Sequence, residues 1–160
     1  MTPPEPAATL LDESRRSLTI GLVLVITLVA FEALASATAF PAVLKDLGGI
    51  RLYGWAFSGF LLASLVGIVL AGHRADDVGP AQPLVVGIAV FGAGLVIVGG
   101  ATSMAMVVAG RVVQGFGGGA VPAVAYVGIG RCYPAELRPR MFFVLSSAWV
   151  LPATRSHTTW

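Results

Sequence analysis

The chain has 160 residues, of which 56% are hydrophobic and only 11% are charged, with ten basic and eight acidic side chains and a net charge of +2. A typical soluble domain carries about 25% charged residues, so this composition excludes a soluble domain, a disordered tail and a nucleic-acid-binding domain. It indicates a multi-span membrane protein whose main partner is the lipid bilayer. Cys132 is the only cysteine, which excludes an intrachain disulfide.

Residues 1–17 are rich in proline and charge, which predicts a polar cytoplasmic tail. The next stretch, 18–44, is long enough to cross about 30 Å of hydrocarbon as a helix. It is apolar all round, unlike the alternating strands of a membrane barrel. Glu32 is its one interruption and the only acid inside a predicted span. A charge there costs about 2.5–3.5 kcal/mol, so Glu32 is a candidate proton carrier; the alternative is a polar contact within the bundle.

The second predicted span, 52–72, contains no charge and has small residues at every fourth position, Gly59, Ala63, Gly67 and Ala71. These residues form one ridge on a helix, and small ridges let two helix backbones approach closely in lipid. The pattern therefore predicts a helix–helix contact.

The third predicted span, 83–101, ends at a turn rich in glycine and serine. In the connection before it, Asp76 and Asp77 precede Pro80. Proline suits the first turn of a helix, and acids there favour the positive helix end. We therefore expect these acids near the start of the third helix.

The fourth predicted span, 106–130, contains Arg111, the only base inside a span. At 1.5 Å per residue, Glu32 lies about 9 Å and Arg111 about 8 Å from the outer boundary of a 30 Å core. We therefore expect the two charges to face a shared cavity and to pair directly or through water, with Gln114 extending the polar patch. The alternative is that the arginine side chain snorkels to the membrane surface.

Farther along the fourth span, a glycine-rich run could be mistaken for a dinucleotide-binding loop. Such a loop would need a preceding strand, whereas this run lies inside an apolar segment. Gly115 and Gly119 instead fit close helix packing. Pro122 removes one backbone hydrogen bond and predicts a kink, so the segment is either a gating element or a tight helix crossing.

The fifth apolar stretch, 141–151, has eleven residues and reaches about 16 Å as a helix. That is too short to span the membrane. Pro152 opens a polar segment, 152–160, that we expect to be an aberrant tail. We favour a truncated or frameshifted product over a re-entrant or interfacial stub.

The distribution of basic residues predicts the orientation of the chain in the membrane. With the N-terminus inside, the cytoplasmic segments hold six basic side chains and the outer ones hold two, which satisfies the positive-inside rule. The six are Arg15, Arg16, Arg74, Arg131, Arg138 and Arg140, and the two are Lys45 and Arg51. We therefore expect a multi-pass protein of the cell (plasma or inner) membrane with a cytoplasmic N-terminus.

The connection between the second and third spans resembles a motif of the major facilitator superfamily, G-x-L-A-D-R-x-G-R. The matching residues are Gly72, Ala75, Asp76 and Gly79, whereas Arg74, Asp77 and Pro80 stand where the motif has Leu, Arg and Arg.

Three further segments resemble the drug:proton antiporter branch of this superfamily. Arg111, Gln114 and Gly115 match its fourth-helix motif, R-x-x-Q-G-x-G. The segment 31–41 is similar to its first-helix motif, with Glu32 at the acidic position, and 133–140 is similar to its basic four-to-five loop.

The resemblance, which covers about 18–151, implies part of the N-terminal six-helix half of a transporter built from two such halves. It implies proton-coupled efflux of an unknown small molecule or drug by alternating access. Glu32 would carry the proton, Arg111 would tune its proton affinity and Asp76 would stabilise one conformational state. We expect this chain to be inactive alone and to need partner helices from the missing half.

A small four-span scaffold or assembly protein that binds a partner through the ridge of small residues is the alternative function. An enzyme is not expected, since no nucleophile has a base at a suitable spacing. The only histidines, His73 and His157, belong to no ligand cluster, so we expect no metal and no cofactor.

Overall fold

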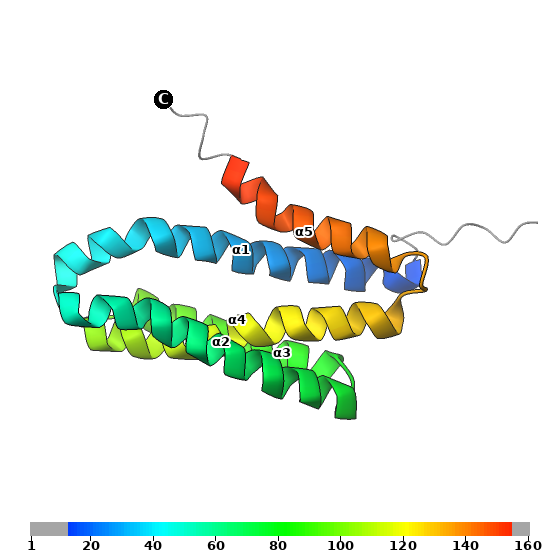
Figure 1. The fold of residues 1–160 in the computed structure, drawn as a ribbon, viewed down its shortest axis with the longest axis horizontal. Helices are drawn as coiled ribbons and strands as arrows, with labels where there is room; N and C mark the ends of the chain where they lie inside the picture. Colours follow the sequence, from blue (N-terminus) through cyan, green and yellow to red (C-terminus); the bar gives the residue numbers. More distant parts are fainter. Residues whose placement is uncertain (1–12, 155–160) are drawn as a thin grey trace, which may run out of the picture.

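The computed structural model describes residues 13–154, which form five α-helices and no β-strand (Figure 1). The first four are long and apolar enough to cross a membrane. The predicted all-α membrane fold, with four spans and a shorter fifth helix, is confirmed. The helices are α1 (Glu13–Leu47), α2 (Ile50–Val78), α3 (Ala81–Gly99), α4 (Met104–Cys132) and α5 (Arg138–Thr154).

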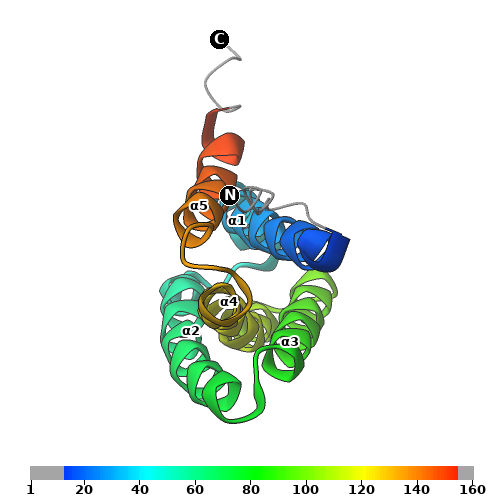
Figure 2. The same ribbon diagram turned by 90° about the vertical axis from the view of Figure 1, so that its right-hand side faces the viewer.

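Helix α4 lies at the centre of the bundle. Helices α2 and α3 pack along its two flanks, whereas α1 crosses its remaining face and carries α5 beside it (Figure 2). The main apolar core forms where α1, α4 and α5 meet, around residues such as Leu22, Ile129 and Met141. Because three helices surround α4, it is the most buried of the four long helices.

Helix α2 approaches α4 closely because a glycine on one helix leaves room for the backbone of the other. A Cβ atom added at Gly119 would clash with the carbonyl oxygen of Ser64 on α2 and lie 2.7 Å from that residue's Cα. One added at Gly115 would lie 2.8 Å from Phe60 Cα, and Gly67 on α2 makes the reciprocal approach to α4. Backbone therefore packs on backbone along this seam.

Gly59, the first residue of the ridge, faces Val112 on α4, whose Cγ2 atom would be 3.0 Å from an added Cβ. Ala71 also lies on this side and is buried against α4. Helix α4 continues through Pro122 to Cys132 without interruption. The predicted kink at that proline therefore does not end or divide the helix.

Helices α1, α2, α4 and α5 are longer than the apolar stretches that predicted them, whereas α3 has the predicted 19 residues. The predicted span 18–44 lies inside Glu13–Leu47, the span 52–72 lies inside Ile50–Val78, and α5 starts at Arg138, before the apolar stretch that begins at 141. Hydrocarbon limits where charged side chains can lie, but it does not limit the helical backbone. Polar turns can therefore continue each helix into the aqueous region.

Smaller shifts separate the remaining predicted bounds from the observed ones. The span 83–101 becomes Ala81–Gly99, the span 106–130 becomes Met104–Cys132, and α5 continues through Pro152 to Thr154. The predicted tails, 1–17 and 152–160, are thus helical where they are described, and the rest of each lies outside the described residues.

Ser103 begins α4 by accepting a hydrogen bond from the backbone N–H of Met106.

Candidate functional site

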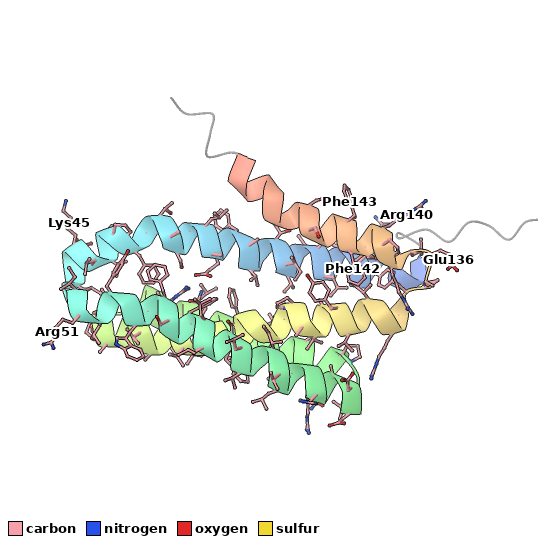
Figure 3. All side chains as sticks on the ribbon, viewed as in Figure 1. Lys45, Arg51, Glu136, Arg140, Phe142 and Phe143 are labelled. Atoms are coloured by element: carbon pink, nitrogen blue, oxygen red, sulfur yellow. The ribbon has the colours of Figure 1, made fainter. Side chains whose placement is uncertain are left out.

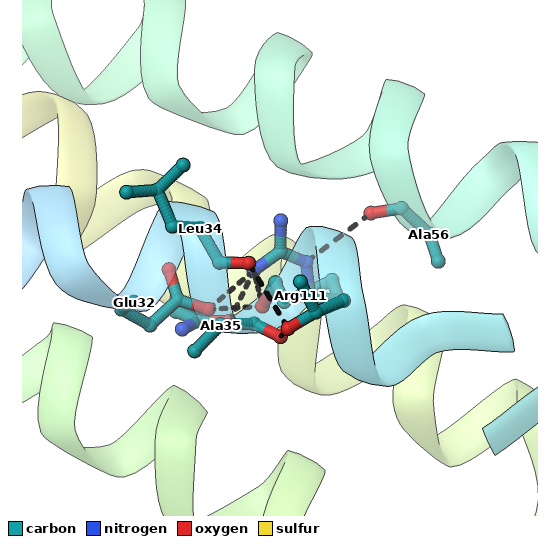
Figure 4. Close-up of polar contacts among 8 residues, drawn as sticks. Glu32, Leu34, Ala35, Ala56 and Arg111 are labelled. Atoms are coloured by element: carbon teal, nitrogen blue, oxygen red, sulfur yellow. Dashed lines mark hydrogen bonds and ion pairs between the residues drawn. The ribbon is translucent and has the colours of Figure 1, made fainter. Parts of the chain in front are cut away.

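Glu32 and Arg111 meet between α1 and α4, in the interior of the bundle (Figure 4). Arg111 Nη1 donates to Glu32 Oε1 at 2.9 Å, and the two side chains are 5% (Arg111) and 10% (Glu32) exposed. The predicted direct pairing is therefore present. The snorkelling alternative for Arg111 is wrong, because its guanidinium points into the bundle and not toward a membrane surface.

Three further acceptors surround the Arg111 guanidinium. Its Nη1 donates to Gln114 Oε1 at 2.8 Å and to Ser36 Oγ at 3.3 Å, and its Nε lies 3.5 Å from the carbonyl oxygen of Ala56 on α2. Ser36 in turn donates to Glu32 Oε1. One cation thus connects α1, α2 and α4, and the burial of this cation is tolerable only because these acceptors replace its hydration shell.

Two aromatic rings enclose the same guanidinium. Its Cζ atom lies 4.1 Å from the centroid of Phe60 and 5.3 Å from that of Phe40. Rings at this distance attract a cation through their quadrupole and displace water from it. The site is therefore a charged pair in an apolar, aromatic enclosure, where each charge acts strongly on the other.

Each end of the cluster retains one unused hydrogen-bonding atom. Within the described residues, Glu32 Oε2 and Gln114 Nε2 are buried and have no partner. Glu32 can therefore accept a further hydrogen bond or a proton, and Gln114 can still donate one. We call Glu32, Ser36, Arg111 and Gln114 the polar cluster.

Sequence reasoning missed three members of this environment. Ser36 lies four residues after Glu32, so helical spacing on one face could have identified it. Phe40 continues that face by one more turn. Phe60 has no such signal, because it lies on α2 and only the approach of α2 to α4 brings it over Arg111.

The loop-motif residues lie away from the polar cluster, at the end of α2. Ala75 is buried, and its carbonyl oxygen accepts from Arg131 Nη1 at 2.9 Å and from the backbone N–H of Gly79 at 3.0 Å. Gly79 has a φ of 89°, which suits glycine and ends the helix. Gly72 lies in the last turns of α2, in open space.

Asp76 forms an ion pair with Arg131 at the end of α4. Its Oδ1 is 3.3 Å from Arg131 Nη2, and the same nitrogen donates a hydrogen bond to the backbone oxygen of Asp76 at 3.0 Å. The prediction that Asp76 and Asp77 begin the third helix is wrong, since both lie in the last turn of α2. The partial negative charge at the C-terminal end of α2 is instead balanced by the Arg131 guanidinium from α4.

Charged side chains otherwise gather at the two ends of the bundle. Lys45 and Arg51 lie at one end, whereas Glu136 and Arg140 lie at the other (Figure 3). Among the described residues, no three His, Cys, Asp or Glu side chains are grouped closely enough to hold a metal ion.

Comparison with known proteins gives a family match over almost the whole described range. Residues 20–154 match the sequence profile described as the Major Facilitator Superfamily. The chain is 33% identical to an "Acurin A biosynthesis cluster MFS-type transporter" of Aspergillus aculeatus, over 73% of this chain and 21% of that protein. It is 31% identical to a "Probable multidrug-efflux transporter" of Mycobacterium tuberculosis, over 78% of this chain and 26% of that protein.

An "Efflux pump" of Gibberella moniliformis is 29% identical over 84% of this chain and 24% of its own length. The chain thus spans about a quarter of the length of these relatives.

Proposed function

Because this chain belongs to the Major Facilitator Superfamily, we propose that it forms the proton-coupling part of a transporter that exports small molecules by alternating access. Its multi-pass helices and the transporter names of its relatives support transport. The buried contact between Glu32 and Arg111 carries the further proposal of proton coupling.

Proton binding to Glu32 would change the cluster in a defined way. The proton neutralises the carboxylate, so the attraction that holds Glu32 to Arg111 is lost. Arg111 would then keep Gln114, the Ala56 carbonyl and the Ser36 hydroxyl as acceptors. Since Glu32 is the charged group that α1 supplies to the cluster and Ser36 is neutral, protonation would weaken the polar link between α1 and the rest of the bundle.

The unused atoms of the cluster support the same role. Glu32 Oε2 can receive a proton without first breaking a hydrogen bond, and Gln114 Nε2 can hold a water or a polar group of a substrate. An ionisable residue within a spanning helix that has a defined partner is typical of proton pathways.

The ion pair between Asp76 and Arg131 would act as a conformational latch. It joins the ends of α2 and α4, and its side chains are 65% and 44% exposed. Exposed pairs contribute about 0–1 kcal/mol. An ion pair of that strength can favour one conformation of the transporter while still allowing the other.

The proposed location is the cell (plasma or inner) membrane, with the N-terminus in the cytoplasm. Arg74, Arg131 and Arg140 lie in the segments that this orientation assigns to the cytoplasm, whereas Lys45 and Arg51 lie at the opposite end of the bundle (Figure 3). Basic residues favour the cytoplasmic side. The substrate path would need helices from a second half, so we expect no transport by these 160 residues alone.

A split-transporter assay tests this function. Membrane vesicles would hold the chain alone or together with the remaining helices of the Mycobacterium tuberculosis relative, and export of a fluorescent drug-like dye would be followed. We expect export only from the combined form and only with a proton gradient. Glu32→Gln should abolish it, whereas Glu136→Gln, in the exposed turn before α5, should not. Export that survives Glu32→Gln or loss of the gradient would contradict proton coupling.

A further inference from the structure

A groove separate from the polar cluster lies between α2 and α3, near the turn that joins them. Its volume is about 390 Å³, within the roughly 300–1,000 Å³ typical of small-molecule sites. Helices α2 and α3 lie on opposite flanks of α4 (Figure 2), and α4 supplies the floor of the groove through Phe116 and Ala120.

The walls of this groove are apolar and open to the outside of the bundle. Leu70 on α2 is 55% exposed and Val86 on α3 is 51% exposed, although both line the groove. Where no other helix covers membrane-spanning helices, the outside is lipid rather than water. The groove is therefore suited to a hydrocarbon chain.

One end of the groove carries a cation and an amide. Arg74, in the last turns of α2, and Gln82, in the first turn of α3, both line it and are exposed. In the part of the chain that the structure describes, the Arg74 guanidinium makes no ion pair and no hydrogen bond. Asp76, the nearby acid on α2, is instead paired with Arg131. Arg74 is thus an available cation at the polar end of an apolar groove.

We propose that this groove binds one anionic phospholipid. The phosphate would accept from the Arg74 guanidinium and the Gln82 amide, and an acyl chain would lie between Leu70 and Val86. Arginine suits this role because its fork of N–H donors matches phosphate oxygens. The proposal rests on the groove and on its lipid surroundings, and it does not depend on the transport function.

Native mass spectrometry of the full chain tests the proposal by measuring how much lipid stays bound. The chain is released from detergent that contains phosphatidylglycerol or phosphatidylcholine with identical acyl chains. We expect phosphatidylglycerol to be retained about fivefold better, since one basic residue near an anionic surface contributes about that factor. Arg74→Gln should bring the ratio close to one and Arg74→Lys should keep part of it. Arg51→Gln, which removes an exposed arginine at the opposite end, should leave it unchanged.

A second pair of variants tests the groove itself. Val86→Phe should fill it and lower the retention of both lipids. Val85→Phe should not, because Val85 is exposed on α3 without lining the groove. Equal retention of the two lipids by the unmodified chain, or a preference that survives Arg74→Gln, would overturn the proposal. Displacement of the bound phosphatidylglycerol by glycerol phosphate, which has no acyl chains, would also overturn the proposal. So would a Val86→Phe variant that changes the amount of chain dimer while leaving the lipid adducts unchanged.

Discussion

Substitution of Gly119 by alanine should separate α2 from α4 and destabilise the bundle. The new Cβ would clash with the carbonyl oxygen of Ser64 and lie 2.7 Å from its Cα, whereas ordinary contact begins at 3.4 Å. The obstacle is backbone, which cannot rotate away, so the helices must move apart by at least about 0.7 Å at this point. Overpacking of this kind costs about 1–3 kcal/mol.

The matched control is Gly92→Ala on α3, where an added Cβ would have no atom within 4 Å. Alanine is favoured over glycine within a helix by about 1 kcal/mol, so this variant should be as stable as the unmodified chain or slightly more stable. Unfolding of the purified chain in mixed micelles with increasing sodium dodecyl sulfate, followed by tryptophan fluorescence, gives both free energies. Equal stability of the two variants would refute the backbone-contact reasoning.

The same unfolding assay tests three other contacts. Arg111→Met should lower the free energy of unfolding by about 3–5 kcal/mol because it leaves Glu32 buried without its cation. Adding Glu32→Gln should recover much of that loss, and strictly additive effects of the two substitutions would argue against the pair. Tyr133→Phe removes a buried hydroxyl contact with Thr19 at 2.6 Å and should cost about 0.5–1.5 kcal/mol, whereas Tyr126→Phe, on the exposed surface, should be neutral. Ser103→Ala removes the N-cap of α4 and should cost about 1 kcal/mol; no loss there would mean that solvent caps the helix equally well.

The number and order of the helices could be predicted because lipid imposes a simple rule on composition. Long stretches with at most one charge, divided by a glycine- and serine-rich turn between the third and the fourth, located all four spans. Their ends could not be predicted from hydropathy, since the apolar run stops at the hydrocarbon boundary while the helix continues. The stretch 72–78 shows this most clearly: its charges suggested a loop, but α2 extends through it to Val78.

Part of the polar cluster was also accessible from sequence. The depths of Glu32 and Arg111 follow from counting residues along two antiparallel helices, and depth is enough to predict that they can meet. The aromatic enclosure was not accessible, because the place where α2 crosses α4 depends on glycines such as Gly115 whose contacts form only in three dimensions. The Asp76–Arg131 pair was missed for the same reason, since it joins two helix ends 55 residues apart in sequence.

The central claim is that Glu32 exchanges a proton inside the bundle, and infrared spectroscopy of the chain in lipid measures this directly. As the pH is lowered, a protonated-carboxyl band that is slow to respond to deuterated water should form reversibly. Glu32→Gln should remove that band, while Glu136→Gln, which lacks an exposed carboxyl, should retain it. A band that persists in Glu32→Gln, or its absence from the unmodified chain at every pH at which the fold is intact, would contradict the account.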